Sequence, residues 1–263
     1  MDVNVFLNTL EVCEATFDEL EQLIPPPKMV SEDDDFHFRY EQKTPKVLVI
    51  QKLSRVYTGL KSCLVLLEKG LYQEVGVIFR LLDEFREDIE FMCISIRSGE
   101  ITELDQRFVN EFFQPEFDNQ NPFLATQKRD RVSRRQIQFA IASITENPVN
   151  PSDSQELART ISNVNSGYVH AASEHILDMY GGNPPGYYLN GMLGTLRQEE
   201  WENLAWNYFY RALLTFMCAA QAFGCAERVQ SLYEYRDGFE QAWGNVDWEC
   251  PEKLIKDLKK KPT

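Results

Sequence analysis

Two long runs of helical apolar spacing meet at a single glycine, Gly70. Apolar residues recur every three or four positions over residues 49–67, and the same spacing continues over residues 71–96. Such spacing places apolar side chains on one face of an α-helix. Glycine commonly ends a helix because it takes the left-handed backbone conformation without strain. Two long helices joined by so short a connection predict an antiparallel helical hairpin.

Further apolar stripes flank this hairpin and predict an all-α protein. The stripe that opens the chain ends at Pro25, because proline supplies no amide donor and clashes with the preceding helical turn. We find no alternating strand pattern of useful length. We therefore predict an all-α helical bundle of about seven to eight helices, built on the long antiparallel hairpin. Its parts would be an acidic N-terminal helix and linker over 1–43, a single helical bundle domain over 44–245 and a basic C-terminal tail over 246–263.

The charge and hydropathy of the chain exclude some classes of partner. A formal net charge of -14 opposes a protein whose whole surface grips nucleic acid or anionic lipid, so we expect no DNA and no membrane as partner. The basic cluster at 128–135 is either a solvated face that pairs with acidic neighbours or a local phosphate or RNA contact. No apolar run approaches the roughly 18 residues of a membrane helix and no secretory leader pattern opens the chain, so the expected compartment is the cytoplasm.

Metal and cofactor chemistry find little support in the sequence. The 6 cysteines are spread along the chain without a C-x-x-C pair, and the 3 histidines form no repeated Glu-x-x-His set. A glycine-rich phosphate loop is also missing. We expect buried free thiols, no metal site and no cofactor.

One predicted helix, 156–180, carries the polar set that is most like a site. Its polar side chains recur every three or four residues, which would place them on one helix face: Arg159, Asn163, Ser166, His170 and Glu174. His170 could act as general acid or base or hold a phosphate, because histidine titrates near neutrality. This face lies almost opposite the apolar stripe, so it either faces water or lines a cleft covered by another helix. His175 falls on the apolar stripe and is expected to be a hydrogen-bonded core histidine.

A second pair of polar residues, Arg80 and Glu84, lies one turn apart on the predicted helix 71–96. Such a pair is usually a surface ion pair worth a few tenths of a kcal/mol. Arginine ahead of glutamate is the weaker orientation for helix stability, which leaves room for a role beyond the helix itself.

Two short motifs connect these residues to a known group of proteins. LLEKGLYQEVGVIFRLLDEFREDIEF over 66–91 contains Arg80 and Glu84, and SGYVHA over 166–171 contains Tyr168 and His170. On these motifs the chain resembles the HEPN-like set of all-helical bacterial domains. The resemblance implies either a ribonuclease of toxin–antitoxin or antiphage type, or an inactive member that acts as a binding and dimerisation module. Catalytic members place an arginine shortly before the histidine, whereas here Arg159 lies farther upstream.

The expected function is a cytoplasmic HEPN-like binding or interaction module, in defence or stress response, with a polar cleft between two helices. The cleft would contain Arg80, Glu84, Ser166, Tyr168 and His170, with Arg159, Asn163 and Glu174 beside them. Arg80 would hold a phosphate or carboxylate, and Glu84 would orient Arg80 or His170. The alternative is a metal-independent endoribonuclease, with His170 as general acid or base and Arg80 or Arg159 stabilising charge. Whether the protein is an enzyme stays open, as do a homodimer, a protein partner and an RNA partner.

Overall fold

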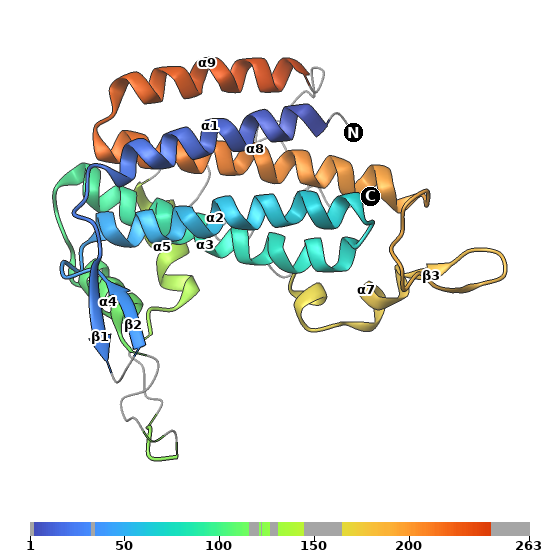
Figure 1. The fold of residues 1–263 in the computed structure, drawn as a ribbon, viewed down its shortest axis with the longest axis horizontal. Helices are drawn as coiled ribbons and strands as arrows, with labels where there is room; N and C mark the ends of the chain where they lie inside the picture. Colours follow the sequence, from blue (N-terminus) through green and yellow to red (C-terminus); the bar gives the residue numbers. More distant parts are fainter. Residues whose placement is uncertain are drawn as a thin grey trace, which may run out of the picture.

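The structure, a computed structural model, is an all-α bundle with two short β-hairpins, which confirms the predicted fold class (Figure 1). It describes residues 3–32, 35–115, 121, 123–126, 131–144 and 165–242. The long helices are α1 (Val3–Glu21), α2 (Pro45–Glu68), α3 (Tyr72–Ser98), α8 (Arg197–Phe223) and α9 (Ala226–Ala242). The shorter helices are α4 (Glu103–Phe113), α5 (Arg134–Ile144) and α7 (Ser173–Leu177). The strands are β1 (Lys28–Glu32), β2 (Asp35–Arg39), β3 (Tyr180–Gly181) and β4 (Gly186–Tyr187).

Helices α2 and α3 form the antiparallel hairpin that the apolar stripes predict (Figure 1). The Thr44 hydroxyl caps α2 by accepting a hydrogen bond from the Val47 amide at 3.3 Å. Gly70 in the turn has a φ of 68°, in the left-handed region that glycine takes without strain. The Gly70 carbonyl accepts a hydrogen bond from the Met192 amide at 2.9 Å, so the segment before α8 is fastened to this turn.

The core lies between four helices, α1, α2, α3 and α8. Helix α8 packs on α2 and α3, and α1 packs on α2 and α8. Helix α9 covers α1 and α8 from outside. The largest fully buried side chains come from all four core helices, and include Phe6, Leu53, Phe79, Phe209 and Phe216. Fully burying one such side chain stabilises a fold by roughly 1.5–3 kcal/mol. The N-terminal helix, which we expected to lie apart from the bundle domain, is therefore one of the four helices around the core.

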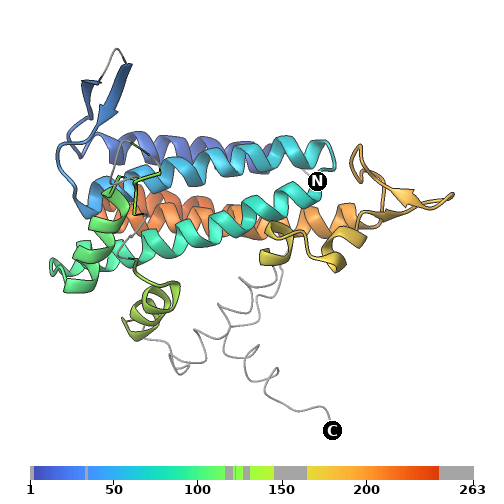
Figure 2. The same cartoon turned by 90° about the horizontal axis from the view of Figure 1, so that it is seen from below.

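The acidic linker expected after the first helix contains a β-hairpin, so the prediction that the chain has no strand was wrong here. β1 pairs antiparallel with β2, with Met29 opposite Phe38, and the hairpin projects from one end of the bundle (Figure 1, Figure 2). Met29, Phe36 and Phe38 are 62%, 64% and 66% exposed. Residues 35–39 alternate polar and apolar side chains, so a strand signal was present in the sequence, although it is short and its apolar side chains are not buried.

The helix predicted over 156–180 does not continue through its described residues, which begin at 165. Residues 165–169 are helical, Ala171 then has a φ of 50°, and the chain turns before α7. The Ala172 amide donates to the Gly167 carbonyl at 2.9 Å, which closes this turn. The His175 ring packs over Gly167 so closely that a Cβ there would lie 2.1 Å from the imidazole. The contact folds α7 back on the preceding turn, so Ser166, His170 and Glu174 do not lie on one continuous helix face.

Candidate functional site

Helix α3 places Arg80 and Glu84 on one face, as their spacing predicts. An Arg80 Nη2 and a Glu84 Oε1 lie 2.8 Å apart, with the arginine side chain 19% exposed. The other terminal nitrogen of Arg80, Nη1, is buried and has no hydrogen-bond partner among the described residues. A buried donor without an acceptor costs about 1–3 kcal/mol. Arg80 is therefore more than a surface ion pair, because one of its nitrogens is available for an acceptor.

The segment at 165–168 lies against the same side of α3. The Tyr168 ring fills the space in front of Gly76, where a Cβ would lie 2.6 Å from it, and meets the Trp201 ring edge-on at 5.3 Å. The Asn165 amide donates to Asp83 Oδ2 at 3.3 Å. Since Gly76 and Asp83 flank Arg80 along the helix, Tyr168 and Asn165 bracket the Arg80 position. Burial raises the pKa of Tyr168, so its phenol stays protonated at neutral pH.

The remaining predicted site residues do not join this group. His170 and Glu174 are exposed and Ser166 is half-buried, with its carbonyl accepting a hydrogen bond from the His170 amide at 3.1 Å. Among the described residues, no hydrogen bond or ion pair connects His170 with Arg80 or Glu84. Arg159 and Asn163 lie outside the described residues.

Asp83 belongs to a buried polar cluster that sequence reasoning missed. The Tyr208 hydroxyl donates to Asp83 Oδ2 at 2.9 Å, and Arg211 Nη2 lies 2.6 Å from Asp83 Oδ1. Asn165 donates to both Asp83 and the Tyr208 oxygen, the latter at 2.5 Å. Burial and then the Asp83 charge raise the pKa of Tyr208, which holds the phenol protonated as a donor. The cluster fastens α3, α8 and the 165–168 segment together.

Asp88, one turn farther along α3, is the second buried carboxylate of this kind. The Lys52 ammonium lies 2.8 Å from Asp88 Oδ2, and the Arg134 guanidinium donates to Asp88 Oδ1. Arg134 also donates to the Glu84 carbonyl at 3.3 Å. Arg134 comes from the basic cluster 128–135, of which 128–130 lie outside the described residues. The contacts of Arg134 therefore support the interpretation that the basic cluster pairs with acidic neighbours, rather than the interpretation that it contacts phosphate or RNA.

Glu87 lies between these two carboxylates and is also buried. Burial raises its pKa, although a hydrogen bond from the Gln138 amide at 2.9 Å and the Arg134 guanidinium at 3.7 Å act in the opposite direction. The direction of the shift means that burial outweighs what these partners contribute to the charged form. The partners of Glu87 therefore compensate the burial of its ionised form only in part.

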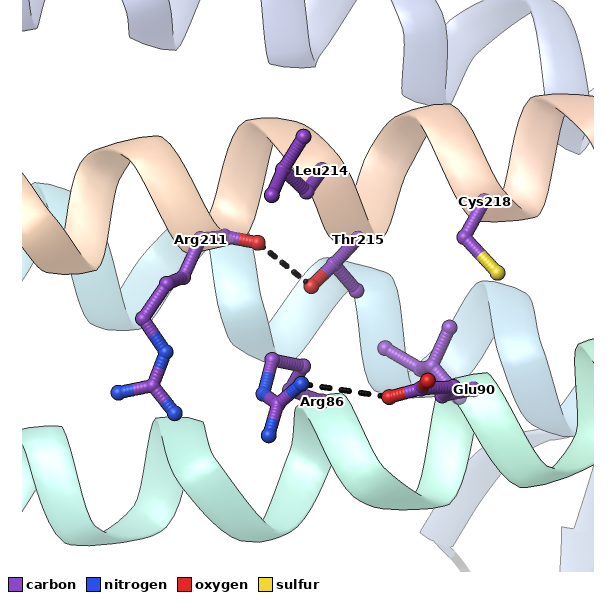
Figure 3. A pocket seen from close by; sticks show the side chains of 7 residues that line it. Arg86, Glu90, Arg211, Leu214, Thr215 and Cys218 are labelled. Carbon is purple, nitrogen blue, oxygen red and sulfur yellow. Dashed lines mark hydrogen bonds and ion pairs between the residues drawn. The ribbon is translucent and has the colours of Figure 1, made fainter. Parts of the chain in front are cut away.

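A pocket opens between α3 and α8, beside the Asp83 cluster (Figure 3). It encloses about 190 Å³ and is lined by Arg86, Ile89, Glu90, Arg211, Leu214, Thr215 and Cys218. Arg86 Nη1 pairs with Glu90 Oε2 at 3.2 Å, whereas the buried Arg86 Nε has no hydrogen-bond partner among the described residues. The Thr215 hydroxyl donates to the Arg211 carbonyl at 2.9 Å, which leaves its oxygen free to accept. The pocket therefore presents two guanidinium groups, one of them with an unsatisfied donor.

The described residues exclude two further kinds of feature. Within them, no group of three or more histidine, cysteine or acidic side chains is arranged to hold a metal ion. None of their helices is both long enough and apolar enough to cross a bilayer. Comparisons with protein-family models, with curated proteins and with solved structures find no match to this chain. The site must therefore be interpreted from its own geometry.

Proposed function

We propose that this chain is a helical binding module that takes an anionic group of a partner, a phosphate or a carboxylate, into the pocket between α3 and α8. The observation that carries the proposal is the buried Arg86 Nε, which has no acceptor although Arg86 lines the pocket. A bound oxyanion would accept from this nitrogen and remove the cost of an unmade hydrogen bond. Arg211 lines the same pocket and adds a second planar set of donors.

The size of the pocket limits what it can hold. Its 190 Å³ is smaller than the roughly 300–1,000 Å³ of pockets that enclose a drug-sized ligand. One phosphate or carboxylate fits such a space, and the rest of a larger ligand would lie outside the pocket. The net charge of -14 opposes a long nucleic-acid footprint, so we favour a protein or a small molecule over RNA as the bearer of the group.

The binding module is favoured over the endoribonuclease alternative. Cleavage would require His170 beside an arginine that stabilises the developing phosphorane charge. His170 is exposed, and among the described residues nothing joins it to Arg80. The HEPN-like resemblance, a role in defence or stress response and a homodimer remain predictions. So does the cytoplasm, a compartment that suits the free thiols of the described cysteines.

Calorimetric titration with inorganic phosphate and with a short dicarboxylate tests anion binding. Arg86→Gln removes the charge and the unsatisfied donor, and we expect at least a tenfold loss of affinity. Glu90→Gln removes the carboxylate that competes for Arg86, and a gain of about 1 kcal/mol, roughly fivefold, is expected for a half-exposed pair. Arg55→Gln is the matched control, because Arg55 is an exposed arginine on α2. Equal affinities in all four proteins would rule out this pocket.

RNA cleavage in excess chelator, with wild type beside His170→Ala, tests the alternative. The proposal expects no cleavage by either folded protein. Cleavage by wild type that disappears in the variant would replace the binding module by a metal-independent nuclease.

A further inference from the structure

A second pocket lies where the C-terminal end of α3 meets α4 and α5. Figure 2 shows these two shorter helices at the end of the bundle where α3 ends. The pocket has a volume of about 440 Å³, within the roughly 300–1,000 Å³ of sites that hold small organic molecules. It shares no lining residue with the α3–α8 pocket, so it is a separate site.

The lining of this second pocket is mainly apolar. Helix α3 contributes Phe91 and Ile94, α4 contributes Leu104 and α5 contributes Ala140. Phe91 is buried, whereas the other three side chains are half-buried. An apolar ligand would therefore cover surface that is now partly in water, which favours its binding.

One buried hydroxyl in this pocket lacks a partner. Ser95 on α3 lines the pocket and is only 3% exposed, and its hydroxyl forms no hydrogen bond with any described residue. Three other buried hydroxyls on the helices, those of Thr9, Thr16 and Thr215, each donate to the carbonyl four residues earlier. The Ser95 hydroxyl makes no such bond, so its proton is left for an acceptor that enters the pocket. A buried donor without an acceptor costs free energy, which a bound ligand would recover.

The charged residues of the pocket indicate which acceptor suits it. Asp105 is buried and accepts a hydrogen bond from the Thr102 amide at 2.8 Å, so its carboxylate is engaged in capping α4. Arg97, in the last turn of α3, forms no hydrogen bond or ion pair with the described residues. A negatively charged oxygen can accept from both the Arg97 guanidinium and the Ser95 hydroxyl. Glu100 also lines the pocket and opposes such a ligand, but it is exposed and its charge is screened by water.

We propose that the pocket between α3, α4 and α5 binds a medium-chain carboxylate. The hydrocarbon chain lies against Phe91, Ile94 and Leu104, and the carboxylate accepts hydrogen bonds from the Ser95 hydroxyl and the Arg97 guanidinium. Apolar walls with a few placed polar groups are the usual composition of a small-molecule site. This inference does not rest on anion binding in the α3–α8 pocket, because the two pockets have no residue in common.

Calorimetric titration of the full chain with octanoate tests the proposal, with octanol and octylamine as probes of the same chain length. We expect saturable binding of octanoate and at least about fivefold weaker binding of the other two, a ratio that corresponds to about 1 kcal/mol. Octanol lacks the charge that Arg97 attracts, and octylamine carries the opposite charge. Absence of octanoate binding, or binding of octylamine as tight as that of octanoate, would overturn the proposal.

Two variants locate the bound carboxylate. Ser95→Ala should weaken octanoate binding at least about fivefold without lowering the melting temperature, because the hydroxyl has no hydrogen bond to lose in the free protein. Arg97→Gln should weaken octanoate binding and leave octanol binding unchanged. Ser62→Ala is the matched control for Ser95→Ala, since Ser62 is an exposed serine on α2.

The same titrations separate this site from the α3–α8 pocket. Unchanged octanoate affinity in both Ser95→Ala and Arg97→Gln would overturn the proposal. Because Arg97 is exposed, its variant decides the question even if Ser95→Ala fails to fold. Octanoate binding that is lost only in Arg86→Gln would place the carboxylate in the α3–α8 pocket, which would overturn this inference and support the proposed function.

Discussion

Deleting the Tyr208 hydroxyl measures how strongly the buried Asp83 cluster holds α3 and α8 together. In Tyr208→Phe the aromatic ring is kept, and with it the stacking on Phe79 at a centroid distance of 3.8 Å. What is lost is the 2.9 Å hydrogen bond to the Asp83 carboxylate and the acceptor for the Asn165 amide. The substitution therefore changes the polar contacts of a buried residue and leaves its packing nearly intact.

The expected loss follows from the burial of the partners. A hydrogen bond to a charged group contributes about 1.5–3 kcal/mol, and Asp83 and Tyr208 are only 5% and 6% exposed. Because Arg211 still pairs with Asp83, the carboxylate is not left alone, and we expect a loss of about 2–3 kcal/mol. In a chain of this size each kcal/mol shifts the melting temperature by roughly 2–4 °C, so the midpoint should fall by about 5–10 °C.

Tyr57→Phe is the matched control for this measurement. The Tyr57 hydroxyl donates to Glu14 Oε2 at 2.8 Å, the same chemistry at almost the same distance, but at the surface. Its removal should cost less than about 1 kcal/mol. Urea unfolding followed by circular dichroism gives both free energies, provided that the slope with urea is unchanged. Equal losses in the two variants would refute the reasoning that burial makes the Asp83 cluster strong.

Two further substitutions on α3 should have opposite outcomes. Asp88→Asn leaves Lys52 and Arg134 without their shared carboxylate, and urea unfolding should show a loss of about 3 kcal/mol. Glu87→Gln keeps an acceptor for Gln138, and because burial raises the pKa of Glu87, this variant should be as stable as wild type at pH 7, or more stable. A raised pKa in the folded state stabilises wild type fully below the ordinary carboxyl value of 4.5, and this contribution is lost as pH rises through the folded pKa. The stability of wild type relative to Glu87→Gln should therefore fall with pH above 4.5, and a constant difference from pH 4 to 8 would contradict the assignment.

The helices could be predicted because apolar periodicity and local end signals determine them. Gly70 and Thr44 mark the ends of α2 in the sequence, and the structure has the helix between them. The break at Ala171 could not be predicted in this way. It depends on the packing of His175 over Gly167, a contact that becomes visible only when the chain has folded back.

The candidate site was predictable only in part, for a similar reason. Arg80 and Glu84 were identified from their spacing. Asp83 and Glu87 were missed because acidic residues at this spacing usually lie on the solvent-facing side of a helix. Whether such carboxylates are buried depends on partners from other helices, and for Asp83 these lie far away in the sequence on α8. A signal was nevertheless present, because the charged side chains of α3 between Arg80 and Glu90 spread over more than half of the helix circumference.

The most direct test of the proposed function locates an anion in the pocket. Crystals of the protein soaked in selenate, a phosphate mimic with a strong anomalous signal, would show where such a group binds. The account predicts an anomalous peak within hydrogen-bond distance of the Arg86 guanidinium in wild type and no peak there in Arg86→Gln. Selenate bound only at surface lysines, or a pocket peak that persists in Arg86→Gln, would contradict it.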